Sequence, residues 1–506
     1  MPEGKTVARA ERVAWAAAAD GILTVARAVV RRPYALIALL IFPVAILYSR
    51  LVYAPCDDAY IYFVYARNFI EGHGLTYNGV HVEGYTSPLW MWTLAAAGLT
   101  GLPLPAIAET LSTLSGLAAL IVTYALAKRI TGTPRLALLA PVLLTASGDF
   151  ALYMGSGLEQ VLFAALVAAV VLVACYSAAA KTWTLPALMA AMILVRPEGV
   201  LIAAIVFAMR WRGATPLGVV VREAAVLAAM LLPFVILRYA VYGYLLPNTY
   251  YVKSGMGLVN LGQGVRYLLR ARWRYGPVAA LVAAAVLAQA NRDRRVLTRL
   301  LPLGAVSAGW LAYVAMQGGD SLLGGRMIVP ILPLGSVAIA ALAGGIGRRP
   351  VARWSFAIGA ALLLVLGYAG DAILHERTVG ERRDATVRQA AGRYLRAHYP
   401  ATTVVALNPA GIIAYYSGLP TIDMLGLNDP YIAHHGKRDV TKPFGHQIGD
   451  GEYVLTRKPG VILLSSIPSD RPGPYISDTE IWNSVEFRKV YQATEWPGIG
   501  WAYVRK

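Results

Sequence analysis

Long apolar runs separated by short polar segments dominate the chain from Pro33 to Tyr368. A helix of about 20 apolar residues is long enough to cross the ~30 Å hydrocarbon core of a bilayer. Runs of this length recur throughout the segment, and their spacing predicts about eleven crossings. The pattern therefore predicts a polytopic α-helical membrane protein.

Two neighbouring apolar runs, 183–195 and 200–209, are each too short to cross a bilayer comfortably. The segment 196–199, with the sequence RPEG, lies between them, so the pair predicts a hairpin whose tip points towards the outer side. Charged, irregular backbone at such depth is tolerated only where it lines a cavity or is buried in protein. The alternative interpretation is a structural ion pair between Arg196 and Glu198.

The pattern changes after Asp371, because residues 372–506 are rich in polar, charged and aromatic residues and contain no further apolar run. Residues 381–397 have helical spacing, and residues 403–407 and 461–465 are typical of buried strands. These elements predict a small soluble α/β domain at the end of the chain.

Composition and charge refine this picture. Of the 506 residues, 57% are hydrophobic and only 15% are charged, whereas soluble domains carry about a quarter. The net charge of +18 does not indicate a nucleic-acid partner, because Lys and Arg concentrate in alternate short loops, as cytoplasmic loops do. We expect a plasma-membrane protein with a cytoplasmic N-terminal segment (1–32), a transmembrane domain (33–371, first outer loop 54–105) and an extracytoplasmic domain (372–506).

The segment directly after the first predicted span carries adjacent acids, Asp57 and Asp58. Carboxylates beside lipid are costly unless they have partners or a function. A helix N-cap is one explanation, and it accounts for one aspartate more easily than for two. The other is catalysis, because side-by-side carboxylates raise each other's pKa and one can then act as a general base. The pair could also hold a divalent cation; no P-loop, GxGxxG or HExxH motif indicates any other cofactor.

Further unusual polar residues fall on the predicted outer half, whereas the inner loops carry mostly plain Lys and Arg. A single outward-facing site explains this asymmetry. Arg and Lys bind phosphate, and a carboxylate can deprotonate a hydroxyl, so such a site suits a lipid-phosphate substrate. An aromatic belt at the membrane surface is the alternative explanation for the tyrosines. The residues concerned are His73, His81, Glu83, Tyr85, Glu159, Arg196, Glu198, Asn248, Tyr251, Lys253, Asp320 and Arg326.

With these residues in view, the chain resembles the GT-C superfamily of polyprenyl-phosphate-sugar glycosyltransferases. It is most similar to the mycobacterial terminal β-(1→2)-arabinofuranosyltransferase family. The ordered set of motifs is specific, although each piece alone is weak. The segments that carry the resemblance are DDAYI at 57–61, EGHGL at 71–75, VEGYTSPLW at 82–90, GLE at 157–159, RPEG at 196–199, PNT at 247–249, GGD at 318–320 and DMLGLND at 423–429.

The resemblance implies a GT-C fold, a polyprenyl-phosphate sugar donor, inverting transfer and an acidic base in the first outer loop. Asp57 or Asp58 would be that base, and Asp57 is preferred. The expected reaction moves a sugar, arabinofuranose by resemblance, onto a glycan acceptor of the cell envelope. A lipid or sugar flippase is the main alternative, and a scaffold whose outer domain does the work is another.

The charge argument divides the remaining candidates into two groups. The first group would bind the donor and its phosphate, and the second would bind substrate. The first group is Arg196, Lys253 and Arg326, with Asn248 and Tyr251. The second group is His73, His81, Glu83, Tyr85, Glu159, Glu198 and Asp320.

Overall fold

The computed structural model describes residues 32–77, 79–177, 182–213, 215–253, 257–290, 294–346, 350–442 and 444–506. The predicted cytoplasmic segment 1–32 therefore lies outside the described residues, except for Arg32.

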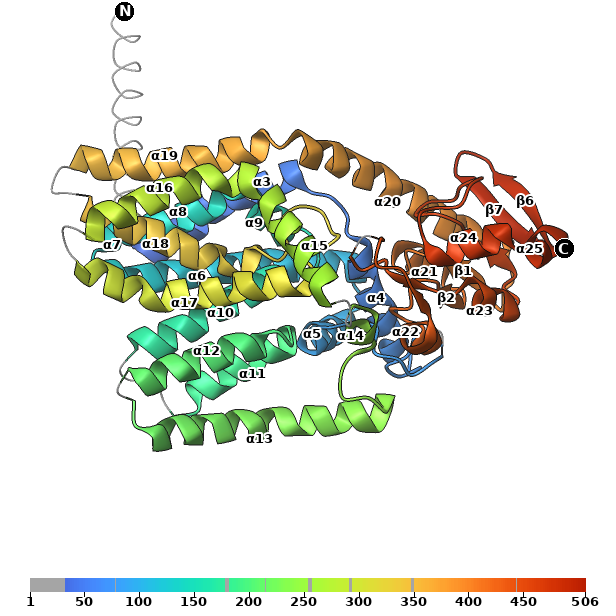
Figure 1. Cartoon of the computed structure of the whole chain (residues 1–506), viewed down its shortest axis with the longest axis horizontal. Coiled ribbons are helices and arrows are strands. Elements are labelled where there is room, and N and C mark those ends of the chain that lie inside the picture. The colour runs from blue at the N-terminus through green and yellow to red at the C-terminus, as the bar shows by residue number, and fades with distance from the viewer. Residues whose placement is uncertain are drawn as a thin grey trace, which may run out of the picture.

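The chain forms an elongated bundle of helices with a smaller domain containing a β-sheet at one end (Figure 1). Most helices of the bundle run along the long axis of the molecule. In chain order the helices up to the sheet are α2 (Pro33–Leu36), the π-helical η1 (Ile37–Ile41), α3 (Phe42–Val52), α4 (Asp57–Ile70), α5 (Pro88–Gly98), α6 (Leu104–Thr131), α7 (Pro134–Ala137), α8 (Leu139–Thr145), α9 (Gly148–Met154), α10 (Gln160–Tyr176), α11 (Thr184–Val195), α12 (Gly199–Arg212), α13 (Leu217–Tyr242), α14 (Asn248–Lys253), α15 (Gly257–Arg270), α16 (Arg272–Ala290), α17 (Arg294–Gln317), the 3-10 turn η2 (Val329–Ile331), α18 (Leu332–Gly345), α19 (Pro350–Ala369) and α20 (Ala372–His398).

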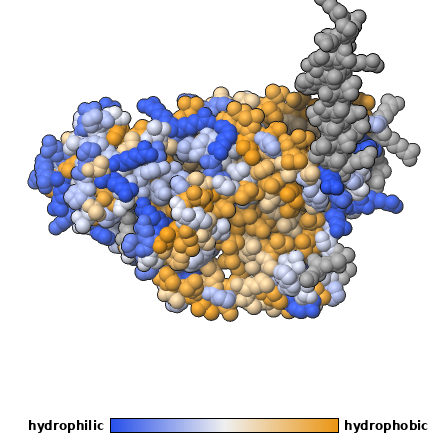
Figure 2. All heavy atoms as spheres, turned by 180° about the vertical axis from the view of Figure 1, so that it is seen from behind, coloured by the Kyte–Doolittle hydropathy of each residue, from blue (hydrophilic) through white to orange (hydrophobic). Residues whose placement is uncertain are grey.

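Several helices are long and apolar enough to cross a bilayer, as expected for a multi-pass membrane protein. Among the described residues five helices meet this condition by length and composition, or six if the bent pair 134–145 and 148–154, which turns by 71°, forms one span. The predicted count of about eleven also includes shorter apolar helices and is not confirmed. Figure 2 shows the apolar side chains gathered in a belt across the bundle, with hydrophilic surface on either side. The five helices are Pro33–Val52, Leu104–Thr131, Leu217–Tyr242, Arg294–Gln317 and Pro350–Ala369.

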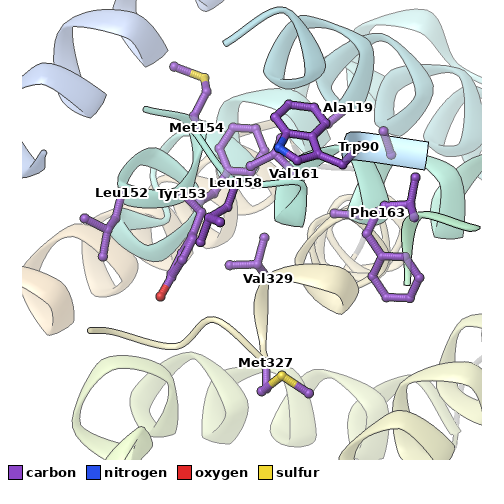
Figure 3. Close-up of a cluster of buried hydrophobic side chains, with 14 of the residues drawn as sticks. Trp90, Ala119, Leu152, Tyr153, Met154, Leu158, Val161, Phe163, Met327 and Val329 are labelled. Carbon is purple, nitrogen blue, oxygen red and sulfur yellow. The ribbon is translucent and has the colours of Figure 1, made fainter. Parts of the chain in front are cut away.

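A cluster of buried apolar side chains lies inside the bundle (Figure 3). Trp90 on α5 is fully buried, and its indole nitrogen donates to the carbonyl oxygen of Gly157 over 3.2 Å. The hydroxyl of Tyr153 on α9 donates to the carbonyl oxygen of Leu323 over 2.6 Å. Close packing of side chains stabilises a helix bundle in lipid, and these polar tips are satisfied as buried groups must be. The cluster thereby fixes the loop after α17 against α9.

Asp371 fixes the start of α20, the helix that leads from the bundle to the C-terminal domain. Asp371 is the N-cap of α20, and its side chain accepts a hydrogen bond from the amide of Leu374 over 3.0 Å. Its other oxygen lies 3.2 Å from Nη1 of Arg274 on α16. Because α20 starts at this fixed point and continues to His398, it leads from the bundle to the domain that contains the sheet (Figure 1).

The C-terminal domain is built on a mixed five-stranded sheet with the order β2-β1-β5-β7-β6. Strand β1 pairs in parallel with β2 and β5, and β7 pairs antiparallel with β5 and β6. The predicted strands near 403–407 and 461–465 correspond to β1 and β5. The elements are β1 (Val405–Leu407), α21 (Ile412–Ser417), β2 (Thr421–Asp423), α22 (Pro430–His435), β3 (Lys437–Arg438), β4 (Ile448–Gly449), α23 (Gly451–Thr456), β5 (Val461–Ile462), α24 (Ile476–Asn483), α25 (Val485–Val490), β6 (Tyr491–Trp496) and β7 (Gly500–Arg505).

Candidate active site

Two cavities meet where the helical bundle adjoins the C-terminal domain. The first, of about 290 Å³, lies between α4, α20 and the C-terminal domain, and we call it the polar cavity. The second, of about 300 Å³, lies between α4, the turn from α11 to α12, the linker from α13 to α14 and the end of α17, and we call it the membrane-side cavity. The residues that line both are Asp58, Ile61, Lys253, Asp320, Arg326 and Leu427.

The two adjacent aspartates at the start of α4 have different surroundings. Both oxygens of Asp57 accept backbone hydrogen bonds of 2.9 Å, from the amide of Gly411 and from the amide of Ile412. Burial raises the pKa of Asp57, while the charge of Arg388 and these two bonds lower it. Neither aspartate is the N-cap of α4, because Cys56 holds that position without a side-chain bond. Asp57 therefore secures the start of α21.

Asp57 also lines the polar cavity, but Asp58 reaches both cavities. Its side chain is 33% exposed and lines both cavities. Within the described residues it forms one ion pair, a long one of 3.5 Å from Oδ2 to Nη1 of Arg326. A carboxylate with this much accessible surface and one weak partner is free to accept a proton from a ligand.

Arg326 is held mainly by Asp320. The guanidinium donates to both carboxylate oxygens, from Nε to Oδ2 and from Nη2 to Oδ1, the latter over 3.0 Å. Such a two-point contact fixes the plane of the arginine. The remaining Nη1 is directed to Asp58. Asp320 thus orients Arg326, and Arg326 orients Asp58.

Arg196 is held between two carboxylates in the turn from α11 to α12. Nη1 donates to Glu159 over 2.9 Å, and Nη2 donates to Glu198 over 2.8 Å. The Arg196 and Glu159 side chains are only 6% and 2% exposed, so the pair is buried. The structural ion pair considered from the sequence is therefore present, with Glu159 as a second partner. One cation against two carboxylates leaves this cluster without spare positive charge.

Lys253 differs from the other cations around the cavities. It lies at the end of α14 and lines both cavities, yet in the part of the chain that the structure describes it has no hydrogen bond or ion pair. Burial lowers the pKa of Lys253, and the nearby charge of Arg326 lowers it further. By contrast, Arg377 and Arg388 in the polar cavity donate to the carbonyl oxygens of Ser321 and Ser466. Lys253 is thus the cation best placed to take an anionic ligand.

Other residues singled out from the sequence lie in or just behind these walls. Tyr85, Glu159 and Glu198 line the membrane-side cavity. Glu83 does not line it, because its carboxylate is buried and paired with Arg238 over 2.7 Å. Asn248 also lies behind the wall, where its amide nitrogen donates to the carbonyl oxygen of Gly426 over 2.8 Å.

Three predicted residues are not brought to either cavity. His73 is exposed and lies 3.7 Å from Glu71, and His81 is exposed as well. Tyr251 packs against His434 of the C-terminal domain, with 4.4 Å between the ring centroids. Its neighbour Tyr250 lines the membrane-side cavity instead, because successive side chains on α14 point in different directions.

The C-terminal domain supplies lining residues that the sequence did not single out. Asn408 and His446 line the polar cavity, and Phe444 lines the membrane-side cavity. Burial lowers the pKa of His446, against the opposing charge of Asp58. No local motif marks these residues, since they reach the cavities only through the tertiary fold.

The divalent cation considered from the sequence finds no cluster of ligands. Across the described residues no three or more His, Cys, Asp or Glu side chains are grouped so that they could hold a metal ion. The acids of the site face Arg326, Arg196 and Arg388 rather than one another.

Comparisons with known proteins find a sequence family for the C-terminal domain and similar solved structures for most of the chain. Residues 375–504 match a family described as a domain of unknown function (DUF8728). A search of curated proteins finds no relative of the chain by sequence.

Two solved structures of ArnT from Cupriavidus metallidurans are similar to this chain. The structure with bound undecaprenyl phosphate has a TM-score of 0.56 and 16% identity, over 76% of this chain and 85% of that one. The apo structure has a TM-score of 0.54 and 15% identity, over 80% and 86%. The chain therefore shares the fold of these ArnT structures.

Proposed function

We propose that this protein is a glycosyltransferase that moves a sugar from a polyprenyl phosphate to a hydroxyl of a glycan acceptor. The observation that carries the proposal is the position of Asp58 and Lys253, which both line the two cavities: the first is a partly exposed carboxylate, and the second is a cation without a partner among the described residues. A base and a phosphate-binding cation at the junction of two cavities are what transfer between two substrates requires.

The membrane-side cavity suits the lipid-linked donor. Leu158, Leu246, Met327 and Phe444 give it apolar walls, and Leu246 is 40% exposed on the linker that follows the membrane helix α13. A prenyl chain could enter along these apolar residues and place its phosphate at the Lys253 ammonium. The bound undecaprenyl phosphate in the ArnT structure supports a donor of this class.

The polar cavity suits the acceptor. Its walls include Asn408, His446 and Tyr475 from the C-terminal domain and a charged face of α20. Hydrogen-bonding and aromatic side chains of these types bind hydroxyl-rich sugars, whereas a prenyl chain would find little apolar surface there. The acceptor hydroxyl would then approach Asp58 from the side opposite the phosphate.

The reaction follows from this arrangement. Asp58 accepts the proton of the acceptor hydroxyl while its oxygen attacks the anomeric carbon of the donor sugar. The bond from that carbon to the phosphate oxygen breaks, and the phosphate leaves with the electron pair towards Lys253. Attack opposite the leaving group inverts the anomeric configuration. Positive charge develops on the sugar ring in the transition state, and the carboxylate of Asp320, which lines both cavities, stabilises it.

Arabinofuranose as the sugar, a cell-envelope glycan as the acceptor and a plasma-membrane location follow from the sequence resemblance and are part of the proposal. In this orientation the N-terminus is cytoplasmic and the C-terminal domain is extracytoplasmic. The charge pattern of the loops supports this orientation, because Lys and Arg concentrate in the loops that it places in the cytoplasm. Both cavities then open on the extracytoplasmic side, where lipid-linked sugars serve as donors.

A transfer assay tests the proposal. Membranes containing the protein are supplied with a panel of radiolabelled decaprenyl-phosphate pentoses and hexoses and with envelope glycan fragments. We expect incorporation of one sugar into the glycan, and loss of incorporation in Lys253→Met. Movement of label across sealed liposomes without any glycosidic product would instead favour a flippase.

A further inference from the structure

A hairpin of the C-terminal domain reaches the junction of the two cavities. Strands β3 and β4 pair antiparallel, with Arg438 opposite Ile448. The residues 444–446, which we call the hairpin tip, lie between them in the chain. Phe444 lines the membrane-side cavity, whereas Gly445 and His446 line the polar cavity. The hairpin tip therefore forms part of the partition between the cavities.

The hairpin tip is anchored on both sides. Within the hairpin the amide of Asp439 donates to the carbonyl oxygen of Gln447 over 3.0 Å. Towards the bundle, the side-chain amide of Gln263 on α15 donates to the carbonyl oxygen of Lys442 over 3.3 Å. These contacts hold the hairpin against the helices rather than leaving it free in solvent.

Phe444 itself is seated against a glycine. Its ring is 8% exposed and packs on Gly318, where an added Cβ would lie 2.6 Å from Cδ2 of the ring. Gly318 also has φ +105°, a conformation that side chains other than glycine rarely adopt. The close approach leaves the ring little freedom to withdraw, so the cavity wall is rigid at this point.

The neighbours of Phe444 place it beside the reacting end of the donor. The same cavity is lined by Lys253, Asp320 and Gly319. A phosphate at Lys253 would put the attached sugar in the space that these residues and the phenyl ring share. An apolar ring offers the sugar no hydrogen bond, so its contribution is to limit the available volume.

We propose that Phe444 sets the size of the donor sugar, so that the domain of unknown function supplies the selectivity of the site. This inference rests on the proposed function and adds to it a role for the C-terminal domain in donor selection. It gives that domain a direct part in the chemistry, since its hairpin tip forms the wall that the donor sugar meets.

Donor competition tests the inference. The full-length protein and Phe444→Ala are each given decaprenyl-phosphate pentose and hexose together, and the ratio of kcat/KM for hexose to that for pentose is measured. We expect the ratio to rise about tenfold or more in Phe444→Ala, the scale on which pocket volume discriminates substrates. Phe444→Leu should give a smaller rise. Val485→Ala, at a 67% exposed position of the same domain, is the matched control and should keep the ratio of the natural protein.

The outcomes separate this inference from the proposed function. If the natural protein transfers neither sugar, the proposed function fails. If it transfers sugar but folded Phe444→Ala keeps the natural ratio, the function stands and the role of Phe444 is wrong. Should Phe444→Ala fail to fold, Phe444→Leu decides, because an unchanged ratio in that variant also overturns the inference.

Discussion

Oδ2 of Asp57 lies 2.9 Å from the amide nitrogen of Gly411, a residue 354 positions later in the chain. This bond, with a second one to the amide of Ile412, attaches α4 to the C-terminal domain beside the polar cavity. The attachment gives Asp57 and Asp58 separate tasks. Asp57 holds the wall of the site in place, whereas Asp58 is the residue that would face the substrates in the proposed reaction.

Replacing Asp57 should therefore reduce stability first. Asp57→Ala leaves the buried amides of Gly411 and Ile412 without acceptors, which costs about 1–3 kcal/mol for each unsatisfied group. We expect a clear fall in the thermal unfolding temperature of the purified protein. Asp58→Ala is the matched control and should unfold close to the natural temperature. Equal unfolding temperatures for Asp57→Ala and the natural protein would rule out the attachment.

Gly411 offers a second test of the same contact. A Cβ at this position would overlap the carbonyl oxygen of Asp57. Overpacking of this kind costs about 1–3 kcal/mol, so Gly411→Ala should expose the C-terminal domain to limited proteolysis. Gly380→Ala is a suitable control, because a Cβ there meets nothing within 4 Å. Equal protease resistance of the two variants would contradict the close packing of α4 on this domain.

The buried cluster around Arg196 should be structural. Replacing Glu159 by Ala removes one of the two carboxylates that hold the Arg196 guanidinium. Breaking a buried ion pair from one side costs about 3–5 kcal/mol, so Glu159→Ala should unfold at a markedly lower temperature in detergent. Glu109→Ala, which removes a partly exposed pair with Arg50, serves as the control and should change little. A Glu159→Ala protein as stable as this control would show that the cluster is not needed for folding.

The pH dependence of donor binding should follow Lys253. Because burial lowers its pKa, the ammonium loses its proton at a lower pH than an exposed lysine does. The positive charge is present below that pKa and lost above it, so the KM for the donor should rise as pH rises through it. Lys253→Arg keeps its charge over this range and should flatten the alkaline limb. An identical limb in both proteins would assign it to another group.

The sequence predicts much of the fold because its signals are local. Apolar runs mark α6, α10 and α13, and the charged interruption at 196–199 correctly predicts a turn between two short helices. The number of crossings is harder to predict, because α10 and α11 are shorter than a full span and the break near Ser147 bends one predicted crossing by 71°. Length alone does not determine how such helices sit in a bilayer.

The candidate site is predicted only in part, for a physical reason. Asp58, Lys253 and Arg326 are identifiable because charge next to apolar runs is unusual. The contact between Arg326 and Asp58 cannot be identified from the sequence, since the two residues are 268 positions apart in the chain. The contributions of Phe444 and His446 also depend wholly on how the C-terminal domain docks. For the same reason the adjacent aspartates look equivalent in the sequence although their partners differ.

The most direct test of the account compares transfer by Asp58→Asn and Asp57→Asn at a temperature where both are folded. The measured quantity is kcat for transfer of sugar from decaprenyl phosphate, with donor binding checked separately. We predict that Asp58→Asn binds donor but loses about 10²–10⁴-fold in kcat, as loss of a general base does, while folded Asp57→Asn keeps most of its activity. Normal turnover by Asp58→Asn would contradict the account.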